Sequence, residues 1–239
     1  MRRHSLSIIV PVLNEAQGVA AALFALRGLR QRGAELIVVD GGSTDATVAV
    51  ATPLADQVLF AARGRASQMN AGAAVARGDI LLFLHADTRV PGHADALIPA
   101  ALGSGKVWGR FDVLIDGRSP WLPLVATMMN WRSRLTGMAT GDQAMFVSRA
   151  TFVAVGGFPA IALMEDIALS RCLRRLSRPA CIGERAITSG RRWEARGVWR
   201  TIWLMWRLRL RYFLGADPDE LAVVYGYAPR DQREPRPGA

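Results

Sequence analysis

A short apolar run that ends in a histidine and an aspartate constrains the fold more than any other stretch. Residues 80–84 read ILLFL, and His85, Ala86 and Asp87 follow them. Five consecutive apolar residues between turn signals predict a strand buried on both faces, as in a parallel sheet. In open α/β sheets the ligand crevice lies beyond the carboxyl ends of the strands, so Asp87 is placed to hold a metal or a ligand. An aspartate there could equally cap the next turn.

Two earlier predicted strands also lead to acidic residues. Residues 7–12 form the first, which is followed by Glu15, and residues 35–39 form the second, which ends at Asp40. Helical segments follow each of them, so the two strands belong to a strand–helix–strand unit and should be parallel. The sequence therefore predicts Glu15 and Asp40 just past the ends of neighbouring strands.

The composition is that of a folded, basic protein. The 239 residues are 51% hydrophobic, which excludes a disordered chain. The apolar runs are shorter than the roughly 20 residues of a membrane span, and we expect no cleavable signal peptide before the first strand. Cys172 and Cys181 show no metal-ligand spacing, so we expect inert thiols in a reducing compartment and a cytoplasmic protein.

The positive charge permits several classes of partner. Thirty basic and 20 acidic residues give a net charge of +10, and a single lysine is present. Such a charge suits nucleic acid, an anionic membrane surface or phosphorylated ligands. No motif that reads a nucleic-acid groove is present, so nucleic acid is not an expected partner.

An arginine and an acidic pair stand at the starts of predicted helices. Arg65 lies in the segment RGRASQMNAG (residues 63–72), which is neither a P-loop nor a dinucleotide fingerprint. It could bind a phosphate at the helix N-terminus, or it could be a solvated surface arginine. Glu165 and Asp166 begin a later helix, where negative side chains complement the helix dipole. The dipole accounts for one carboxylate, and the second suggests a further role.

Two segments carry large apolar residues at helical spacing. The stripe in residues 120–135 predicts a helix that faces the core, with a binding groove as the alternative. Residues 191–213 combine an aromatic face with a stripe of arginines, which is typical of a helix at a membrane surface. A second apolar side of that segment fits a core or dimer contact instead. Residues 231–239 are polar and proline-rich, and we expect them to be disordered.

Five short motifs occur in order over roughly residues 5–180. They read IVPVLNE (9–15), VVDGGSTD (38–45), NAG with ARG (70–72 and 76–78), LFLHAD (82–87), and GGF (156–158) followed by Glu165 and Asp166. In this order and spacing they resemble family 2 glycosyltransferases, which have a GT-A fold. More narrowly, GDQ (141–143) and RRW (191–193) resemble a bacterial subgroup found near radical-SAM and arsenosugar or selenium-associated genes.

The resemblance implies one α/β domain of the GT-A, Rossmann-like kind. Its central sheet should be mostly parallel and flanked by helices, over residues 1–190. A basic, aromatic helical appendage over residues 191–230 and the tail 231–239 complete the predicted organisation.

The resemblance also implies a reaction, the transfer of a sugar from a nucleotide diphosphate sugar with inversion at the sugar. UDP is the expected nucleotide, and the sequence does not identify the acceptor. Asp166, beside Glu165, would be the general base, and Asp87 would ligate Mg²⁺ or Mn²⁺ on the pyrophosphate. Donor-binding positions would be Pro11, Asn14, Glu15, Asp40, Gly42, Arg65, His85 and Ala86. Gly141, Asp142 and Gln143 would lie on the acceptor side.

One position departs from the family pattern. His85 replaces the first aspartate of the family's Asp-x-Asp motif. Its imidazole could bind a ribose hydroxyl, or it could join Asp87 on a softer metal such as Mn²⁺. Asp87 alone is sufficient for Mg²⁺, which typically takes only one or two protein carboxylates.

Two other functions compete with this interpretation. A nucleotidyltransferase would need a glycine-rich loop with a lysine or arginine near the first strand, where residues 11–15 read PVLNE. A non-catalytic, membrane-peripheral nucleotide-sugar-binding protein is suggested by His85 and by residues 191–213. The presence of both Asp87 and Asp166 argues against that second alternative. If residues 191–213 bind lipid, the protein would lie on the inner face of the membrane.

Overall fold

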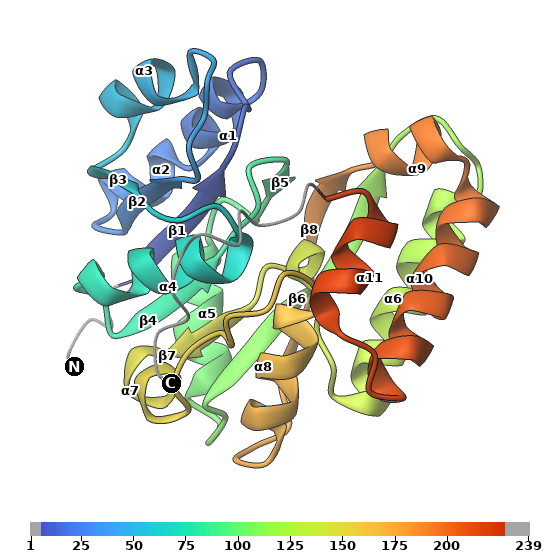
Figure 1. Ribbon diagram of the computed structural model, residues 1–239. Helices are drawn as coiled ribbons and strands as arrows, with labels where there is room; N and C mark the ends of the chain where they lie inside the picture. Colours follow the sequence, from blue (N-terminus) through green and yellow to red (C-terminus); the bar gives the residue numbers. More distant parts are fainter. Residues whose placement is uncertain (1–5, 228–239) are drawn as a thin grey trace, which may run out of the picture.

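The computed structural model describes residues 6–227, and one eight-stranded sheet forms its centre (Figure 1). The strands are β1 (Leu6–Val12), β2 (Glu35–Asp40), β3 (Gln57–Phe60), β4 (Ile80–Phe83), β5 (Thr88–Arg89), β6 (Trp108–Asp116), β7 (Phe146–Ser148) and β8 (Ala180–Ser189). Their order in the sheet is β3-β2-β1-β4-β7-β6-β8-β5. Six strands run in one direction, whereas β7 and β5 are antiparallel to their neighbours. The predicted α/β architecture with a mostly parallel sheet is confirmed.

Helices cover both faces of the sheet. They are α1 (Val19–Ala25), α2 (Arg27–Gln31), α3 (Thr47–Ala51), α4 (Arg65–Val75), α5 (Ala94–Leu102), α6 (Leu122–Thr136), α7 (Arg149–Ala154), α8 (Glu165–Arg174), α9 (Arg191–Arg196), α10 (Val198–Phe213) and α11 (Pro218–Tyr225), with short 3-10 turns η1 (Thr52–Leu54) and η2 (Gly141–Gln143). Buried residues of α1, α2, α3 and α5 pack on one face, and those of α4, α7 and α8 pack on the other.

The central strands are apolar on both sides because both of their faces are covered. In β4 all four residues are buried: Leu82 belongs to one core cluster, and Leu81 and Phe83 belong to the other. Each fully buried aliphatic or phenyl side chain contributes about 1.5–3 kcal/mol relative to an exposed one. The apolar run at residues 80–84 therefore encodes the middle of the sheet, as its sequence predicts.

Helix α4 lies unusually close to the sheet at Gly72. A Cβ atom placed on Gly72 would lie 2.5 Å from Cγ2 of Ile9 and 3.0 Å from Cγ2 of Val39. Both neighbours are fully buried in β1 and β2. The glycine of the NAG motif therefore sets the distance between α4 and the two strands whose ends form the site described below.

The α6 stripe contradicts the sequence-based expectation. Its large apolar residues are 47–67% exposed, so the prediction that they face the core is wrong. The helix instead packs through Leu122, Val125 and Ala126 against β6 and α10. Two faces of α6 are apolar, and periodicity alone does not say which of them is buried. The exposed residues are Trp121, Leu124, Met128, Trp131 and Leu135.

The C-terminal helices form a layer beside the sheet, where α10 lies next to α6 (Figure 1). The segment predicted as one helix is divided into α9 and α10 at Gly197. One face of α10 joins the start of α8 and α11 in a buried cluster around Leu208. The opposite face exposes Trp199, Trp203, Trp206, Leu210 and Phe213. The apolar side that fits a core contact is buried, whereas the aromatic side, for which a membrane surface is predicted, is the exposed face of the same helix.

The exposed stripes of the two helices meet. The rings of Trp121 and Trp199 lie 5.2 Å apart between centroids. Within residues 6–227, no helix is long and apolar enough to cross a membrane. The predicted tail at 231–239 and the end of the predicted appendage lie outside the described residues.

Replacing a helical glycine with alanine usually stabilises a protein, but at Gly72 we expect the opposite. We expect Gly72→Ala to destabilise the protein by about 1–3 kcal/mol, because the added methyl group overpacks a fully filled interface. In α2, a Cβ on Gly28 would meet nothing closer than 3.5 Å, so Gly28→Ala should stabilise by roughly 0.5–1 kcal/mol. Urea unfolding of both variants measures the difference, and an equal gain in both would contradict the close approach of α4.

Candidate active site

Two adjoining cavities lie at the carboxyl ends of the central strands. The first, which we call the strand-end cavity, has a volume of about 250 Å³. It is lined by residues that follow β1 and β4, by the start of α4, and by Ala162, Arg192 and Tyr227. The second, which we call the α8 cavity, has a volume of about 120 Å³ and lies among η2, the start of α8, the end of β8, α9 and α10.

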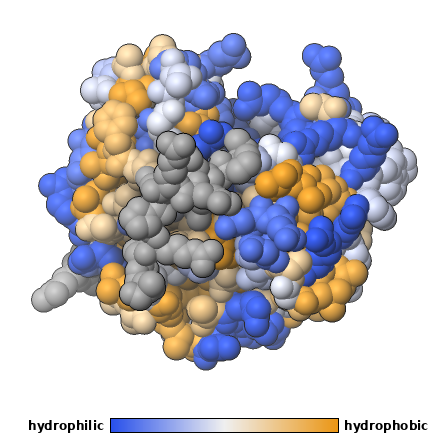
Figure 2. Space-filling model, viewed as in Figure 1, coloured by the Kyte–Doolittle hydropathy of each residue, from blue (hydrophilic) through white to orange (hydrophobic). Residues whose placement is uncertain are grey.

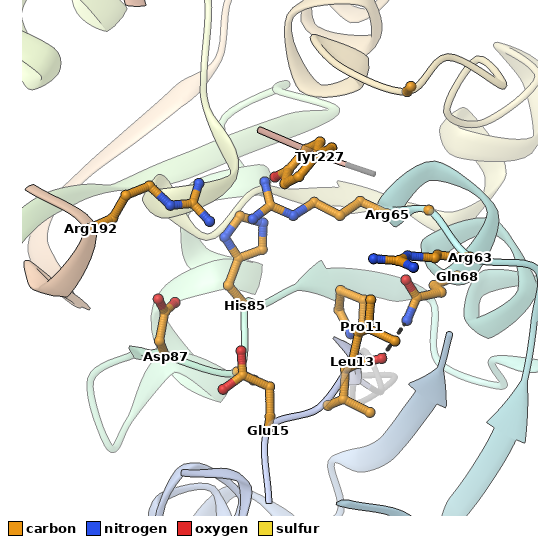
Figure 3. A pocket seen from close by; sticks show the side chains of 14 residues that line it. Pro11, Leu13, Glu15, Arg63, Arg65, Gln68, His85, Asp87, Arg192 and Tyr227 are labelled. Atoms are coloured by element: carbon orange, nitrogen blue, oxygen red, sulfur yellow. Dashed lines mark hydrogen bonds between the residues drawn. The ribbon is translucent and has the colours of Figure 1, made fainter. Parts of the chain in front are cut away.

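The two cavities share one wall. Four residues line both of them, and they carry both signs of charge. In Figure 3, Arg65 and Arg192 extend toward each other on one side of His85, and Glu15 and Asp87 lie on the other side. A molecule in one cavity can therefore meet a molecule in the other at this wall. The shared residues are Arg65, His85, Asp87 and Arg192.

Ten of the predicted site residues line one or both cavities. On the strand-end side they are Pro11, Glu15, Arg65, His85, Ala86 and Asp87. On the α8 side they include Gly141, Asp142, Glu165 and Asp166. The other four, which line neither cavity, are Asn14, Asp40, Gly42 and Gln143.

Asp40 and Asn14 hold the loop after β2 in place. The Asp40 carboxylate accepts hydrogen bonds from the backbone amides of Gly42 and Ser43, both at 2.8 Å, and from the Ser43 hydroxyl. Asn14 Oδ1 accepts a hydrogen bond from the Thr44 amide at 2.9 Å. These contacts tie the loop to the residues after β1, so Asp40 and Asn14 shape the cavity from behind its wall.

Gln68 performs a similar task between two strands. Its side-chain amide donates hydrogen bonds of 2.8 Å to the carbonyls of Val12 and Val39, which lie near the ends of β1 and β2. The dashed line in Figure 3 marks the bond to Val12. On the other side of the site, Gln143 is buried and forms a capping box with Thr140 at η2. Both glutamines position backbone that the lining residues depend on.

His85 faces the η2 loop. Its Nδ1 lies 3.5 Å from Oδ1 of Asp142. A Cβ on Gly141 would come within 2.3 Å of Cε1 of His85, so only glycine allows this loop to lie against the imidazole. Burial acts to raise the pKa of Asp142, but the hydrogen bond and charge of His85, followed by Arg65, hold it below its usual value.

The two carboxyl groups at the start of α8 differ in their hydrogen bonds and in their burial. Asp166 accepts hydrogen bonds from the backbone amides of Gly141 at 2.9 Å and Ile167 at 2.7 Å. Glu165 is 6% exposed. Burial, together with the charge of Asp166, raises the pKa of Glu165 to about 7, although Arg65 acts in the opposite direction. Asp166 is therefore held by two backbone amides at the cavity, while burial favours the protonated form of Glu165.

The surrounding charges come from distant parts of the chain. Burial acts to lower the pKa of Arg65, but Tyr227 and Glu165 hold it above its usual value. The Arg65 guanidinium lies 5.7 Å from the centroid of the Tyr227 ring. Burial also raises the pKa of Glu15, and Arg191, at 3.9 Å, opposes that shift. The C-terminal segment thus completes a site that begins at β1.

Backbone strain marks the same region. Among residues 6–227, three residues other than glycine have a left-handed backbone: Asn14 (φ 53°), Ala144 (φ 48°) and Met164 (φ 71°). Each adjoins a predicted site residue. Such conformations cost on the order of 1–3 kcal/mol each and persist where the surrounding structure holds them, often at functional sites.

Asp87 is the residue best placed to hold a metal ion. It is exposed at the wall between the cavities, and Thr88 Oγ1 lies 3.4 Å from its Oδ1. Across residues 6–227, no three histidine, cysteine, aspartate or glutamate side chains form a group that could hold an ion by themselves. One exposed carboxylate fits Mg²⁺ or Mn²⁺ when water and phosphate oxygens supply the other ligands.

Comparison with known families shows what class of protein this is. The model for glycosyl transferase family 2 matches residues 7–152, which is more than half of the chain. This chain belongs to that family.

Sequence relatives point to the same class. An uncharacterized glycosyltransferase of Mycobacterium tuberculosis, Rv0539, is 31% identical over 138 residues, which cover 56% of this chain and 62% of the relative. A second one from that organism, Rv1514c, is 34% identical over 115 residues, or 44% of each chain. The chain thus spans less than two thirds of the length of these relatives.

Solved structures share the fold. The crystal structure of S. aureus TarS in complex with UDP has a TM-score of 0.62 at 16% identity, covering 77% of this chain and 60% of that chain. Glucosyl-3-phosphoglycerate synthase from Mycobacterium tuberculosis, in complex with Mg²⁺ and UDP, has a TM-score of 0.57 at 21% identity, covering 77% and 70%. The fold is therefore GT-A, as the sequence motifs predict.

Sequence reasoning missed several residues that line the cavities. Arg63 and Gln68 lie inside the segment that was singled out for Arg65, so their neighbourhood was visible in the sequence. Tyr225 and Tyr227 had no local signal, because they lie about 140 residues beyond His85. Arg192 was noted only as part of the RRW motif.

The raised pKa of Glu165 should make folding stability depend on pH. Its pKa is about 7 in the folded protein and 4.5 in the unfolded chain, so the folded state holds a proton that the unfolded state has lost between these values. Stability should therefore fall by on the order of 3 kcal/mol as the pH rises from about 4.5 to above 7.

Glu165→Gln removes this titration and should abolish that part of the loss. Urea unfolding of wild type and variant at pH 5 and pH 8 measures it. If both proteins show the same change between the two pH values, Glu165 does not hold a proton in the folded state.

Proposed function

We propose that this protein transfers a sugar, with inversion, from a UDP-sugar to an acceptor hydroxyl. The observation that carries the proposal is the wall shared by the two cavities. It brings Arg65, whose guanidinium suits a diphosphate, and Asp87, which could hold a cation on that diphosphate, next to the α8 cavity, which Asp166 lines. A direct displacement needs the donor and the acceptor to meet in this way.

The strand-end cavity is the proposed donor site. Uridine lies against the end of β1 and the residues after it, where Pro11 and Glu15 line the cavity and Asp40 supports the neighbouring loop. The diphosphate lies at the shared wall, where the guanidinium of Arg65 stabilises its negative charge. His85, held by Asp142, borders the same position.

Asp166 is the proposed general base. The acceptor hydroxyl oxygen forms a bond to the anomeric carbon, and the bond from that carbon to the diphosphate oxygen breaks, with its electron pair leaving on UDP. The hydroxyl proton goes to the Asp166 carboxylate, a transfer typically worth about 10² to 10⁴ in rate. The amides of Gly141 and Ile167 hold this carboxylate in place. Because the acceptor attacks from the side opposite the leaving group, the configuration inverts.

A divalent cation fits the proposal. Asp87 would hold Mg²⁺ or Mn²⁺ together with the donor's diphosphate, and the bound ion would stabilise the charge of the leaving group as a Lewis acid. Glucosyl-3-phosphoglycerate synthase, which shares the fold, has been solved with UDP and either Mg²⁺ or Mn²⁺, and this supports a divalent cation here.

The alternatives are less well supported by the site. A nucleotidyltransferase would need a cationic, glycine-rich loop after β1, where the strand-end cavity has Pro11, Leu13 and Glu15. A non-catalytic binding protein has no use for Asp166 held in the second cavity. The narrower assignment, to the subgroup found near radical-SAM and arsenosugar or selenium-associated genes, rests on residues 141–143 and 191–193 alone.

Two variants separate donor binding from chemistry. We expect wild type to bind UDP more tightly with Mn²⁺ than without it, and Asp87→Ala to lose that gain. Asp166→Asn should bind UDP and Mn²⁺ as wild type does. When cell extract supplies the acceptor, however, the variant should transfer the sugar, and so release UDP from the UDP-sugar, about 10² to 10⁴ times more slowly.

Calorimetry and a UDP-release assay make these measurements, and each variant is the control for the other. If wild type binds UDP equally well without metal, Asp87 does not hold a cation in the donor site. If turnover is unchanged in Asp166→Asn, Asp166 is not the general base.

We further propose that the protein works at the inner face of the membrane, bound through the α6–α10 surface. This surface consists of the exposed stripes of the two helices, and five of the chain's seven tryptophans lie on it. Neither helix contains an acidic residue, and Arg200 and Arg207 are exposed beside the tryptophans. Aromatic side chains at headgroup level with neighbouring arginines suit an anionic bilayer. Figure 2 shows hydrophobic and hydrophilic groups mixed over the part where α9, α10 and α11 lie in Figure 1.

Vesicle sedimentation tests this surface. Binding should be stronger to vesicles with phosphatidylglycerol than to neutral ones, should weaken with salt, and should fall on the order of tenfold in Trp203→Ala. Phe60→Ala is the matched control, because Phe60 is 72% exposed on β3, outside this surface. Absence of vesicle binding, with a dimer seen by light scattering, would assign the surface to a second copy of the chain.

A further inference from the structure

Arg65 lies against an aromatic ring at the wall between the two cavities. Among residues 6–227, its guanidinium forms no hydrogen bond or ion pair. It lies over the ring of Tyr227 instead, 5.7 Å from the ring centroid, and Figure 3 shows the two side chains next to each other. Both residues line the strand-end cavity. The contact with Tyr227 is therefore part of the site itself.

This kind of contact leaves the hydrogen-bonding groups of an arginine unused. A guanidinium within about 6 Å of a ring centroid is attracted by the negative face of the ring, without an N–H donor being used up. An ion pair with a nearby acid would occupy some of the donors. Asp142 faces His85 instead, and Glu15 lies 3.9 Å from Arg191. Arg65 is thus held in place while its donors stay available to a ligand.

The ring of Tyr227, rather than its hydroxyl, makes the contact. The Tyr227 hydroxyl is shielded from solvent, and within residues 6–227 it has no hydrogen-bond partner. A hydroxyl in that state contributes no hydrogen bond to the fold. A phenylalanine at this position would offer Arg65 the same kind of ring face.

Residues of the C-terminal segment hold the Tyr227 ring at this place. The ring of Tyr225 meets it edge to face, 5.0 Å away between centroids, and the Tyr227 amide donates a hydrogen bond of 2.9 Å to the carbonyl of Ala222. Arg196 Nη1 donates a hydrogen bond of 2.8 Å to the carbonyl of Tyr225. Gly226, between the two tyrosines, has a left-handed backbone (φ 92°), which ends α11 and turns the chain. Several contacts thus fix the ring that supports Arg65.

We propose that Tyr227 is a positioning residue of the donor site, which holds Arg65 so that its N–H groups meet the diphosphate. The inference rests on the proposed glycosyl transfer. It adds a residue that lies beyond all five sequence motifs, the last of which ends at Asp166. Because the Arg65 side chain is already held, less of its freedom is lost when the diphosphate binds. The C-terminal segment thereby contributes to donor affinity through Arg65.

Calorimetric titration of the full chain with UDP, in the presence of Mn²⁺, tests the proposal. Tyr227→Leu keeps an apolar side chain but removes the ring face, and it should weaken UDP binding about tenfold. Tyr227→Phe keeps the ring face and should bind UDP as wild type does. Tyr212→Leu is the matched control, because Tyr212 packs against the same apolar cluster as Tyr227 but lines neither cavity. Its UDP affinity should equal that of wild type.

A double variant shows whether Tyr227 acts through Arg65. Arg65→Gln alone should weaken UDP binding by roughly tenfold to a hundredfold, because it removes the charged donors. Adding Tyr227→Leu to Arg65→Gln should cause no further loss, since no guanidinium is left to position. A ring that bound the nucleotide directly, or that only supported the fold, would cause the same loss in both backgrounds.

The outcomes separate this inference from the proposed function. The inference alone would be overturned by equal losses in the two backgrounds, or by a loss in Tyr227→Phe as large as that in Tyr227→Leu. An equal loss in Tyr212→Leu would also overturn it, because general loosening of the C-terminal helices would then explain the effect. Failure of wild type to bind UDP would overturn the proposed function and this inference with it.

Discussion

The pairing of β4 with β1 on one side and β7 on the other determines where everything else in the site can lie. β4 runs parallel to β1, with Ile9 opposite Phe83, and antiparallel to β7, with Leu82 opposite Phe146. The carboxyl end of β4 therefore lies beside the end of β1, which leads to Glu15, and beside the start of β7, which follows η2. Asp87 and His85 therefore emerge between the proposed nucleotide-binding half, which contains β1 to β4, and the second half, which begins in the sheet with the antiparallel strand β7. The shared wall of the two cavities follows from this one strand.

The second half supplies groups that the parallel strands alone do not. The η2 loop lies against His85 and holds Asp166 through the Gly141 amide. The C-terminal helices then close the α8 cavity with Arg192, Arg209 and Tyr225. One face of α10 thus belongs to the site, while its other face continues the exposed tryptophans of α6. A single helix couples the proposed acceptor cavity to the proposed membrane surface, which would place a lipid-linked acceptor near Asp166.

The sequence predicts those features of the fold and the site that a few neighbouring residues determine. Apolar runs that end in acids predicted β1, β2 and β4 and placed Glu15 and Asp87 at the cavity, because strand ends fix side chains within a few residues. Asp40 follows the same pattern but is turned into its own loop by the amides of Gly42 and Ser43, and sequence spacing does not show such contacts. Helical periodicity places the stripe of α6 in the core wrongly, because it marks an apolar face without showing what covers that face. The places of Tyr227 and Arg209 at the cavities depend on the packing of the C-terminal helices, which no local motif specifies.

We propose that nucleotide and cation meet at the wall between the two cavities. A crystal structure with UDP and Mn²⁺, with the metal located from its anomalous signal, would show whether they do. We expect uridine in the strand-end cavity, the diphosphate beside Arg65, and Mn²⁺ shared between the diphosphate and the Asp87 carboxylate. UDP bound outside the strand-end cavity, or Mn²⁺ held by residues other than Asp87, would contradict it.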